Sequence, residues 1–249
     1  MTTQPLIGAI VLAAGKGSRM KSKAANKVTL AIGTKPLILH IVERLDDVNI
    51  HPIVVVVGFA KESVMNAVSG KGIIFAEQKK RLGTGHATIK GLQALPKDVK
   101  DVFIVYGDEF SYPKEKTQEL IDKHIALGSA LTFLTIEVEN PFGLGRIVRD
   151  ADGNVVKIVE EKDATEEERR IKEVNPGSYV CTREFLEKYL PKIKKSEVTG
   201  EYYLTSIIDL AMEHSEKVDT VQAGAMIWKG INTKEELAEA QQVFAVLDN

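Results

Sequence analysis

Cysteine, tryptophan and long apolar runs are all scarce in this chain of 249 residues. Its single cysteine, Cys181, cannot form an internal disulfide, which fits a reducing compartment, and we expect a cytoplasmic protein. No apolar run approaches the roughly 20 residues that a membrane helix requires, so a membrane is not an expected partner. Leu6–Ala14 is apolar, but no Lys or Arg precedes it, and a secretory signal peptide has the opposite order of charge.

An excess of charge of either sign is also missing. The 33 Lys and Arg against 35 Asp and Glu leave a net charge of −2, so no basic field favours nucleic acid as a partner. The five histidines lack metal-ligand spacing, which argues against a zinc site. No G-x-S-x-G motif occurs, so a serine nucleophile has no support.

What the sequence does contain is an alternation of short apolar strands and amphipathic helices. Strands that are apolar on both faces are typical of a mainly parallel sheet with helices on both sides. Because the alternation implies right-handed crossovers, we expect an α/β fold with a Rossmann-like sheet. The expected strands cover 6–14, 52–58, 72–76, 101–108 and 130–138, and the expected helices cover 36–48, 61–68, 85–95 and 116–128.

The pattern changes near Asn140. A hairpin is predicted with its turn at Asp152-Gly153, and Thr165 with Glu168 has the form of a capping box before a short charged helix. A strand over 175–182 and helices over 183–190 and 203–213 follow. Because no linker separates the parts, we expect a single domain over 1–249, with a first lobe at about 1–139, a smaller lobe at about 140–230 and a closing helix at about 233–247.

The stretch "AIVLAAGKGSRMKS" places two glycines, Gly15 and Gly17, directly after the first strand. Glycines allow close backbone approach, and exposed N–H groups with Lys16 and Arg19 would suit a polyanion. Ligands of open parallel sheets bind beyond this end of the strands. Met20 replaces the third glycine of a dinucleotide fingerprint, and P-loop spacing is absent. A glycine turn with solvated charges therefore remains the alternative.

Two further motifs follow later strands. Asp108 ends the strand at 101–108, where a carboxylate facing a phosphate loop could hold Mg²⁺, or could cap the next helix. Before the helix at 85–95, Gln78, Gly83 and Thr84 offer an amide and backbone groups that can read a base edge. The alternative there is a helix N-terminus with Thr84 as its cap.

The second lobe supplies groups that suit a sugar. Glu160 can accept hydrogen bonds from two adjacent hydroxyls, and a glycine at 145 leaves room for a ring, whereas Glu161 and Lys162 are interpreted as a solvated face. Near the end of the chain, Asn232 could reach a metal or act as a helix cap. Further hydrogen-bonding candidates, some of which could equally be packing residues, are Asn175, Tyr203 and Thr205.

Taken in order, these motifs resemble a known family. "LAAGKGSRM", "NKV", "LGTGHA", "YGD", "GLGRIVRDADGNVVKIVEEKDATEEERR", "EVNPG", "GEYYLT" and "GIN" are similar to the sugar-phosphate nucleotidyltransferases, in particular the N-acetylglucosamine-1-phosphate uridylyltransferases. The likeness spans roughly Ile7 to Phe244. Nothing in the 249 residues resembles the hexapeptide-repeat acetyltransferase half of bifunctional members, so no acetyltransferase domain is expected.

The resemblance implies a role for each matching position and makes the first lobe nucleotide-binding and the second sugar-binding. It implies that the phosphates and the reaction depend on Lys16, Arg19 and Lys27, and that Mg²⁺ is the cofactor, held by Asp108 and Asn232. It implies nucleotide binding by Leu12, Ala13, Ala14, Gly15, Gly17, Gln78, Gly83, Thr84 and Gly107, and sugar binding by Gly145, Glu160, Asn175, Tyr203 and Thr205.

The reaction implied is attack of N-acetylglucosamine 1-phosphate on UTP, which gives UDP-N-acetylglucosamine and pyrophosphate. A different sugar 1-phosphate or nucleotide remains open, as does a non-catalytic protein that binds nucleotide sugars. The expected partners are these small molecules, and a homo-oligomer is compatible with the sequence.

The chain departs from the family pattern at several positions. Ala25-Asn26 replaces the usual Leu-Pro before Lys27, from which we expect a less rigid loop. Glu109 follows Asp108 and is expected to add a carboxylate near the metal, and Pro176 follows Asn175 where Thr is usual.

Overall fold

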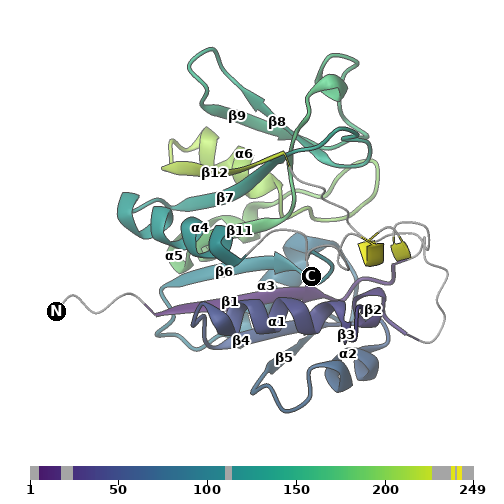
Figure 1. Ribbon diagram of the computed structural model, residues 1–249. Coiled ribbons are helices and arrows are strands. Elements are labelled where there is room, and N and C mark those ends of the chain that lie inside the picture. The colour runs from purple at the N-terminus through teal and green to yellow at the C-terminus, as the bar shows by residue number, and fades with distance from the viewer. Residues whose placement is uncertain (1–5, 18–24, 110–113, 226–236, 239, 243–249) are drawn as a thin grey trace.

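The computed structural model describes residues 6–17, 25–109, 114–225, 237–238 and 240–242. Within these residues, one continuous sheet contains the strands β1 (Ile7–Ala13), β4 (Ile53–Val57), β5 (Ile74–Glu77), β6 (Asp101–Tyr106), β7 (Leu131–Glu137), β8 (Gly145–Arg149), β9 (Val155–Val159), β10 (Glu173–Asn175), β11 (Ser178–Thr182) and β12 (Val218–Ala225). Their order is β5-β4-β1-β6-β11-β7-β10-β8-β9, and β12 also pairs with β7. Figure 1 shows the strands of the first half of the chain below those of the second half.

The first four strands in this order, β5-β4-β1-β6, are all parallel. In the middle of them, Ala9 of β1 lies opposite Ile53 on one side and Phe103 on the other. β1 and β4 are apolar throughout because helices cover both of their faces, as the sequence predicted.

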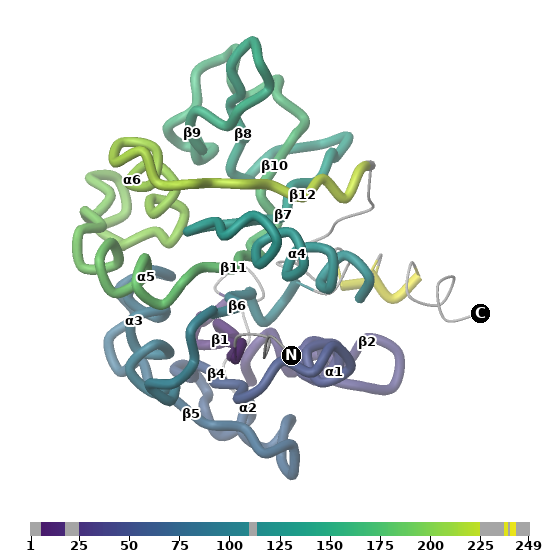
Figure 2. Tube along the Cα trace, turned by 90° about the vertical axis from the view of Figure 1, so that its left-hand side faces the viewer, coloured from purple at the N-terminus to yellow at the C-terminus, as the bar shows by residue number. Residues whose placement is uncertain are grey.

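Two apolar cores lie on the two faces of the sheet, and consecutive residues of β1 alternate between them. Ile10 points into the core on one face, whereas Ala9 and Val11 point into the other. Figure 2 shows α3, α5 and α6 on the first side and α1 and α4 on the opposite side. The helices are α1 (Leu37–Asp47), α2 (Lys61–Ala67), α3 (Thr84–Ala94), α4 (Lys114–Leu127), α5 (Arg183–Tyr189) and α6 (Ser206–Glu213).

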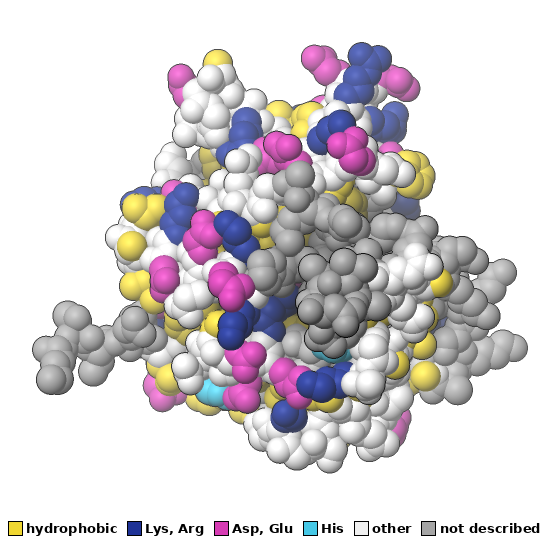
Figure 3. Space-filling view, viewed as in Figure 1, with side chains coloured by type: hydrophobic (Ala, Val, Ile, Leu, Met, Phe, Trp, Pro, Cys, Tyr) yellow, Lys and Arg dark blue, Asp and Glu magenta, His cyan; other side chains and the backbone are white. Residues whose placement is uncertain are grey.

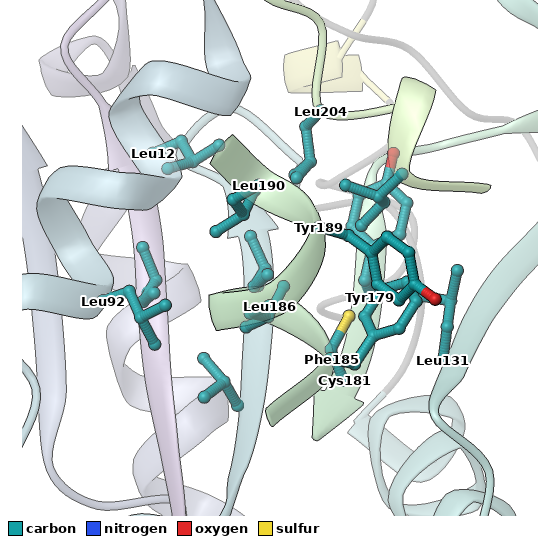
Figure 4. Packing of buried hydrophobic residues seen from close by; sticks show 14 of the residues in the cluster. Leu12, Leu92, Leu131, Tyr179, Cys181, Phe185, Leu186, Tyr189, Leu190 and Leu204 are labelled. Atoms are coloured by element: carbon teal, nitrogen blue, oxygen red, sulfur yellow. The ribbon is translucent and has the colours of Figure 1, made fainter. Parts of the chain in front are cut away.

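The core beneath α3, α5 and α6 extends across both halves of the molecule. Figure 4 shows Leu12 and Leu92 of the first half together with Phe185, Leu186 and other residues of the second half. Because one core serves both lobes, we expect them to unfold together.

β11 lies in the middle of the sheet, where it runs antiparallel to β6 on one side and to β7 on the other. Beyond it, β7 is parallel to β12 and antiparallel to β10, and β8 and β9 form a hairpin at the far edge. The short strand β10 and the strand β12 were not predicted from the sequence.

Local motifs of the second lobe form as predicted. At the hairpin turn, the Asp150 carboxylate accepts hydrogen bonds from the backbone N–H groups of Asp152 and Asn154, at 3.0 Å and 2.8 Å. The Thr165 hydroxyl accepts from Glu168 N and the Glu168 carboxylate accepts from Thr165 N, so the capping box is confirmed. The segment that follows is a single 3₁₀ turn at 168–170, which is shorter than the helix expected there.

Part of the predicted C-terminal helix falls within the described residues. Residues 237–238 and 240–242 are helical, and Ala240 packs against Ile32 and Leu37.

Among the helices that the structure describes, none is long and apolar enough to cross a membrane. Figure 3 shows acidic and basic side chains interspersed on the visible face, as the balanced charge suggests.

Candidate functional site

The carboxyl ends of β1, β4 and β6 meet at one edge of the sheet, and the glycine-rich turn leaves β1 there. No described residue accepts a hydrogen bond from the backbone N–H groups of Ala14, Gly15, Lys16 and Gly17. An added Cβ at Gly15 would meet no described atom within 4 Å. A row of exposed N–H groups beside an open space is the kind of arrangement that binds anions.

Lys27 lies directly against this turn. Gly17 has a φ of +58°, and a Cβ there would come within 3.1 Å of the Lys27 side chain, so glycine leaves room for the lysine stem. The Lys27 ammonium forms an ion pair with the Asp108 carboxylate, and both side chains are mostly buried, at 16% and 18% exposure. Gly107 N donates to Leu12 O at 2.9 Å, which fixes the Asp108 segment beside the turn.

These groups line one cavity, which we call the glycine-turn pocket. Its wall combines the end of β1 and the glycine turn with charged side chains from four other segments. It is lined by Leu12, Ala13, Ala14, Gly15, Lys16, Gly17, Asn26, Lys27, Val28, Gln78, Arg81, Gly83, Thr84, Ala87, Tyr106, Asp108 and Glu201.

Gln78 presents an acceptor to the glycine-turn pocket. Its Nε2 donates to Gly83 O at 3.0 Å and lies 2.9 Å from His86 Nδ1. Burial, aided by the charge of Lys90, lowers the pKa of His86, so the neutral ring accepts at Nδ1. With both amide hydrogens engaged, the Gln78 carbonyl is left for a ligand with an N–H donor.

The turn before α3 is joined to a distant loop. Gly83 has a φ of +101°, and a Cβ there would lie 2.5 Å from Tyr202 O. The Thr84 hydroxyl accepts a hydrogen bond from Leu204 N at 2.9 Å. Thr84 is the first residue of α3, and Gly83 occupies the cap position, so the alternative of Thr84 as the N-cap is wrong. The hydroxyl instead serves the contact with the second lobe.

A second cavity, which we call the second-lobe pocket, shares the wall residues Thr84, Tyr106 and Asp108 with the first. The two cavities therefore meet at the end of β6. The second-lobe pocket is lined by Thr84, Tyr106, Asp108, Glu109, Gly143, Leu144, Gly145, Glu160, Asn175, Pro176, Tyr179, Tyr203 and Thr205.

Tyr106 was missed by the sequence analysis, although it lies in the wall between the pockets. Burial, with a further contribution from the charge of Glu160, raises the pKa of Tyr106 to about 12, so its hydroxyl stays protonated and can donate. A tyrosine that ends a buried strand immediately before Gly-Asp was the available signal.

The predicted sugar residues gather in the second-lobe pocket. The Thr205 hydroxyl donates to Glu160 Oε1 at 2.8 Å, and burial raises the pKa of Glu160. A Cβ on Gly145 would lie 3.0 Å from the Ile158 side chain and 3.7 Å from the same carboxylate oxygen, so glycine avoids a tight contact with Ile158 beside Glu160. Tyr203 Oη lies 2.7 Å from the hydroxyl of Thr199, which holds its ring at the pocket edge.

Asn175 shapes the loop that it belongs to. Its Oδ1 accepts from Gly177 N at 2.8 Å, and its Nδ2 donates to the Tyr179 hydroxyl. Each end of the amide thus has a protein partner, and the second hydrogen and second lone pair remain for a ligand.

Glu109 lines the second-lobe pocket together with Asp108, but its side chain turns to other partners. It is buried, at 2% exposure, and its Oε2 accepts from the Ser178 hydroxyl at 3.2 Å and lies 3.7 Å from the Arg44 guanidinium. The negative charge of the Glu109 carboxylate is therefore balanced by Arg44 of α1.

Glu161 is the main correction to the sequence-based site. It was interpreted as part of a solvated face, but its carboxylate accepts from Gly143 N at 3.0 Å and pairs with Arg146, which is 1% exposed. Burial alone would raise the pKa of Glu161, but these contacts outweigh burial and lower it. The Arg146 guanidinium also donates to Leu144 O, so the pair holds the loop before Gly145.

We expect Glu161→Gln to lower stability by about 1–3 kcal/mol, because it leaves the buried Arg146 guanidinium without its counter-charge. At roughly 2–4 °C per kcal/mol for a chain of this size, calorimetry would show a clear fall in Tm. The control is Lys162→Gln at the exposed neighbouring position, which should stay within about 0.5 kcal/mol of the parent. Equal effects of the two changes would contradict the role given to Glu161.

The remaining candidates are Arg19 and Asn232, which lie outside the described residues. Within the described ranges, no cluster of three or more His, Cys, Asp or Glu side chains forms a metal cage. The donor set at Asp108 nonetheless fits Mg²⁺, which prefers one or two carboxylates with substrate phosphates. In addition, the Asp108 carboxylate already pairs with a cation, the Lys27 ammonium.

Comparison with known proteins places this geometry in context. The profile of the family described as nucleotidyl transferase matches residues 8–245. The bifunctional protein GlmU of Caldicellulosiruptor saccharolyticus is 42% identical over 236 residues, which cover 94% of this chain and 50% of that protein. The GlmU of Francisella tularensis subsp. novicida is 43% identical over 241 residues, covering 96% and 51%. The chain thus spans about half the length of these relatives.

A solved structure has the same fold. A crystal structure of a Bacillus anthracis protein assigned as a glucose-1-phosphate thymidylyltransferase, in complex with sucrose, superimposes with a TM-score of 0.79. The match covers 96% of this chain and 95% of that one at 19% identity.

Proposed function

Because this chain belongs to the nucleotidyl transferase family, we propose that it transfers a uridylyl group from UTP to N-acetylglucosamine 1-phosphate. The products are UDP-N-acetylglucosamine and pyrophosphate. The observation that carries this proposal is the meeting of two pockets at Asp108, one lined by a glycine-rich cationic turn and the other by sugar-type hydrogen bonders. The similar proteins support the choice of family, but they are about twice as long as this chain.

The chemistry of the proposed reaction is mainly one of alignment. Both substrates are anions, and a phosphate monoester is already nucleophilic at neutral pH, so no activating base is needed. The N–H groups of the glycine turn, for which no described residue is an acceptor, would bind the triphosphate, and Lys16, Lys27 and Arg19 would neutralise it. Holding the attacking phosphate in line with the departing pyrophosphate removes much of the entropic barrier.

The metal and base contacts follow the same geometry. Asp108 and Asn232 would hold Mg²⁺, which supplies further neutralisation of phosphate charge when bound. The Gln78 carbonyl would accept from the N–H of uracil, and the backbone at Gly83 and at the end of β1 would line its other edges. Gly107 would keep Asp108 at this edge through its hydrogen bond to Leu12 O.

In the second-lobe pocket, the recognition of the sugar would rest on charge-assisted and hydroxyl hydrogen bonds. Glu160 accepts from sugar hydroxyls, and the protonated Tyr106 donates across the wall between the pockets. Gly145 gives the ring room, and Asn175, Tyr203 and Thr205 complete the lining.

The test is a panel of UTP, dTTP and CTP with N-acetylglucosamine 1-phosphate and glucose 1-phosphate, in which pyrophosphate release is measured. We expect the highest kcat/KM for UTP with N-acetylglucosamine 1-phosphate. A higher value for another pair would replace the proposed substrates while retaining the reaction class. Binding of UTP without pyrophosphate release from any pair would instead indicate a non-catalytic sensor of nucleotide sugars.

A further inference from the structure

Asn26 is a buried polar side chain, 1% exposed, at the floor of the glycine-turn pocket. Its Nδ2 lies 2.9 Å from Ala13 O, 3.1 Å from Gly15 O and 2.9 Å from Phe59 O. Its Oδ1 accepts from Val28 N at 3.2 Å. One carboxamide therefore joins the end of β1, the glycine turn and the segment after β4. The sequence analysis expected a less rigid loop here, but Asn26 itself is held on several sides.

These contacts set the direction of the N–H groups in the glycine turn. In a trans peptide the carbonyl and the following N–H point to opposite sides. Because Ala13 O and Gly15 O face Asn26, the N–H groups of Ala14 and Lys16 face away from it. These are two of the four N–H groups for which no described residue is an acceptor.

The same residue fixes the start of the segment that carries Lys27. Asn26 is the N-cap of the 3₁₀ turn over Lys27–Thr29. Its backbone carbonyl accepts a hydrogen bond from the Thr29 hydroxyl at 2.7 Å. Its own N–H donates to the Ser63 hydroxyl at 3.2 Å. The backbone of Lys27 is thereby held against the glycine turn, where the lysine stem lies along Gly17.

We propose that Asn26 is a positioning residue that sets the glycine turn and Lys27 at the spacing which a nucleoside triphosphate requires. It touches no substrate itself. It acts by binding the carbonyl oxygens of Ala13 and Gly15, which sets the direction of the N–H groups that follow them. This inference rests on the proposed function, since it assumes that the turn binds the phosphates of UTP. A different side chain at position 26 could still accept from Val28 N but lack donors that reach the three carbonyls. Such a variant would keep the N-cap and lose the spacing between the glycine turn and Lys27.

The test variant is therefore Asn26→Ser, because serine is a good N-cap and is too short to bridge the three carbonyls. We expect the Kd for UTP, measured by calorimetry, and the KM for UTP to rise about tenfold, which corresponds to roughly 1.4 kcal/mol. The KM for the sugar 1-phosphate should change by less than about twofold, since a general loss of stability would not act on one substrate alone.

The matched control is Ser63→Ala, which removes a hydrogen bond to Asn26 N and leaves the three carbonyl contacts intact. It should lower Tm but leave UTP affinity within about twofold of the parent. Asn26→Asp is the second variant. It keeps the shape and the cap, and it replaces the NH2 group, which donates, with a carboxylate oxygen, which only accepts. It should weaken UTP binding at least as much as Asn26→Ser.

Three results would overturn the assignment. These are unchanged UTP affinity in a folded Asn26 variant, equal weakening of both substrates, or equal effects of Asn26→Ser and Ser63→Ala. Failure of the proposed function is seen separately in the parent protein, which would then either not bind UTP or bind it without releasing pyrophosphate from any substrate pair.

Discussion

Replacing Asp108 with alanine is expected to lower kcat by roughly 10²–10³-fold or more, the loss typical of a preorganised group that stabilises developing charge. The reason is geometric. Asp108 lies in the wall shared by both pockets and pairs with Lys27, so it faces the place where two phosphates would meet. Without it, the divalent cation loses a carboxylate ligand and Lys27 loses the partner that holds its ammonium at the wall.

The measurement is steady-state pyrophosphate release at saturating UTP and sugar 1-phosphate, with Mg²⁺ titrated for each protein. Asp98→Ala is the control, since Asp98 is an exposed carboxylate that lines neither pocket, and its turnover should match the parent. Melting curves of both variants separate a loss of fold from a loss of chemistry. Near-normal turnover of Asp108→Ala with Mg²⁺ would show that the metal assignment is wrong.

Replacing Gly83 with alanine is expected to cause the largest loss of stability, about 3–5 kcal/mol, and to abolish tight UTP binding. The added Cβ would lie 2.5 Å from Tyr202 O and 2.7 Å from Tyr202 N, and these are backbone atoms that cannot rotate away. Both are already fixed, because Gly85 N donates to Tyr202 O and Tyr202 N donates to Leu82 O, each at 2.8 Å. Relief of the clash must therefore move the loop at Tyr202 away from the turn before α3, beside the glycine-turn pocket.

The comparison that isolates this clash is Gly153→Ala. Gly153 also has a positive φ, +84°, but a Cβ there meets no described atom within 4 Å. It should cost only about 1 kcal/mol for the strained backbone. Calorimetry gives the two values of Tm, and equal shifts for the two variants would contradict the packing argument.

The parts of the fold that the sequence predicts well are those decided by neighbours along the chain. β1 and β4 are apolar on both faces, and the hairpin turn and the capping box depend on residues two to four apart. β12 was missed because its sequence, VDTVQAGA, has neither a continuous apolar run nor a regular polar/apolar alternation, and its partner β7 lies far away in the sequence.

The site follows the same division. Most of the predicted site residues could be found from motifs along the chain, and they line two adjoining pockets. The partners that hold these residues in place are far away in the sequence. Thr84 accepts from Leu204, which is 120 residues away, and Asn26 donates to Phe59, 33 residues away. Glu161 looked solvated because its partner Arg146 becomes buried only when β8 pairs with β10. Such roles require the tertiary structure.

The place of β11 between β6 and β7 limits how the protein can respond to substrates. Because β11 is hydrogen-bonded to β6 on one side and to β7 on the other, a hinge rotation between the two halves of the sheet would break backbone hydrogen bonds along both pairings. Under the proposed function, we therefore expect substrate binding and product release to depend on side chains and loops around a rigid sheet, so that an inhibitor spanning both pockets would meet a nearly constant distance between them.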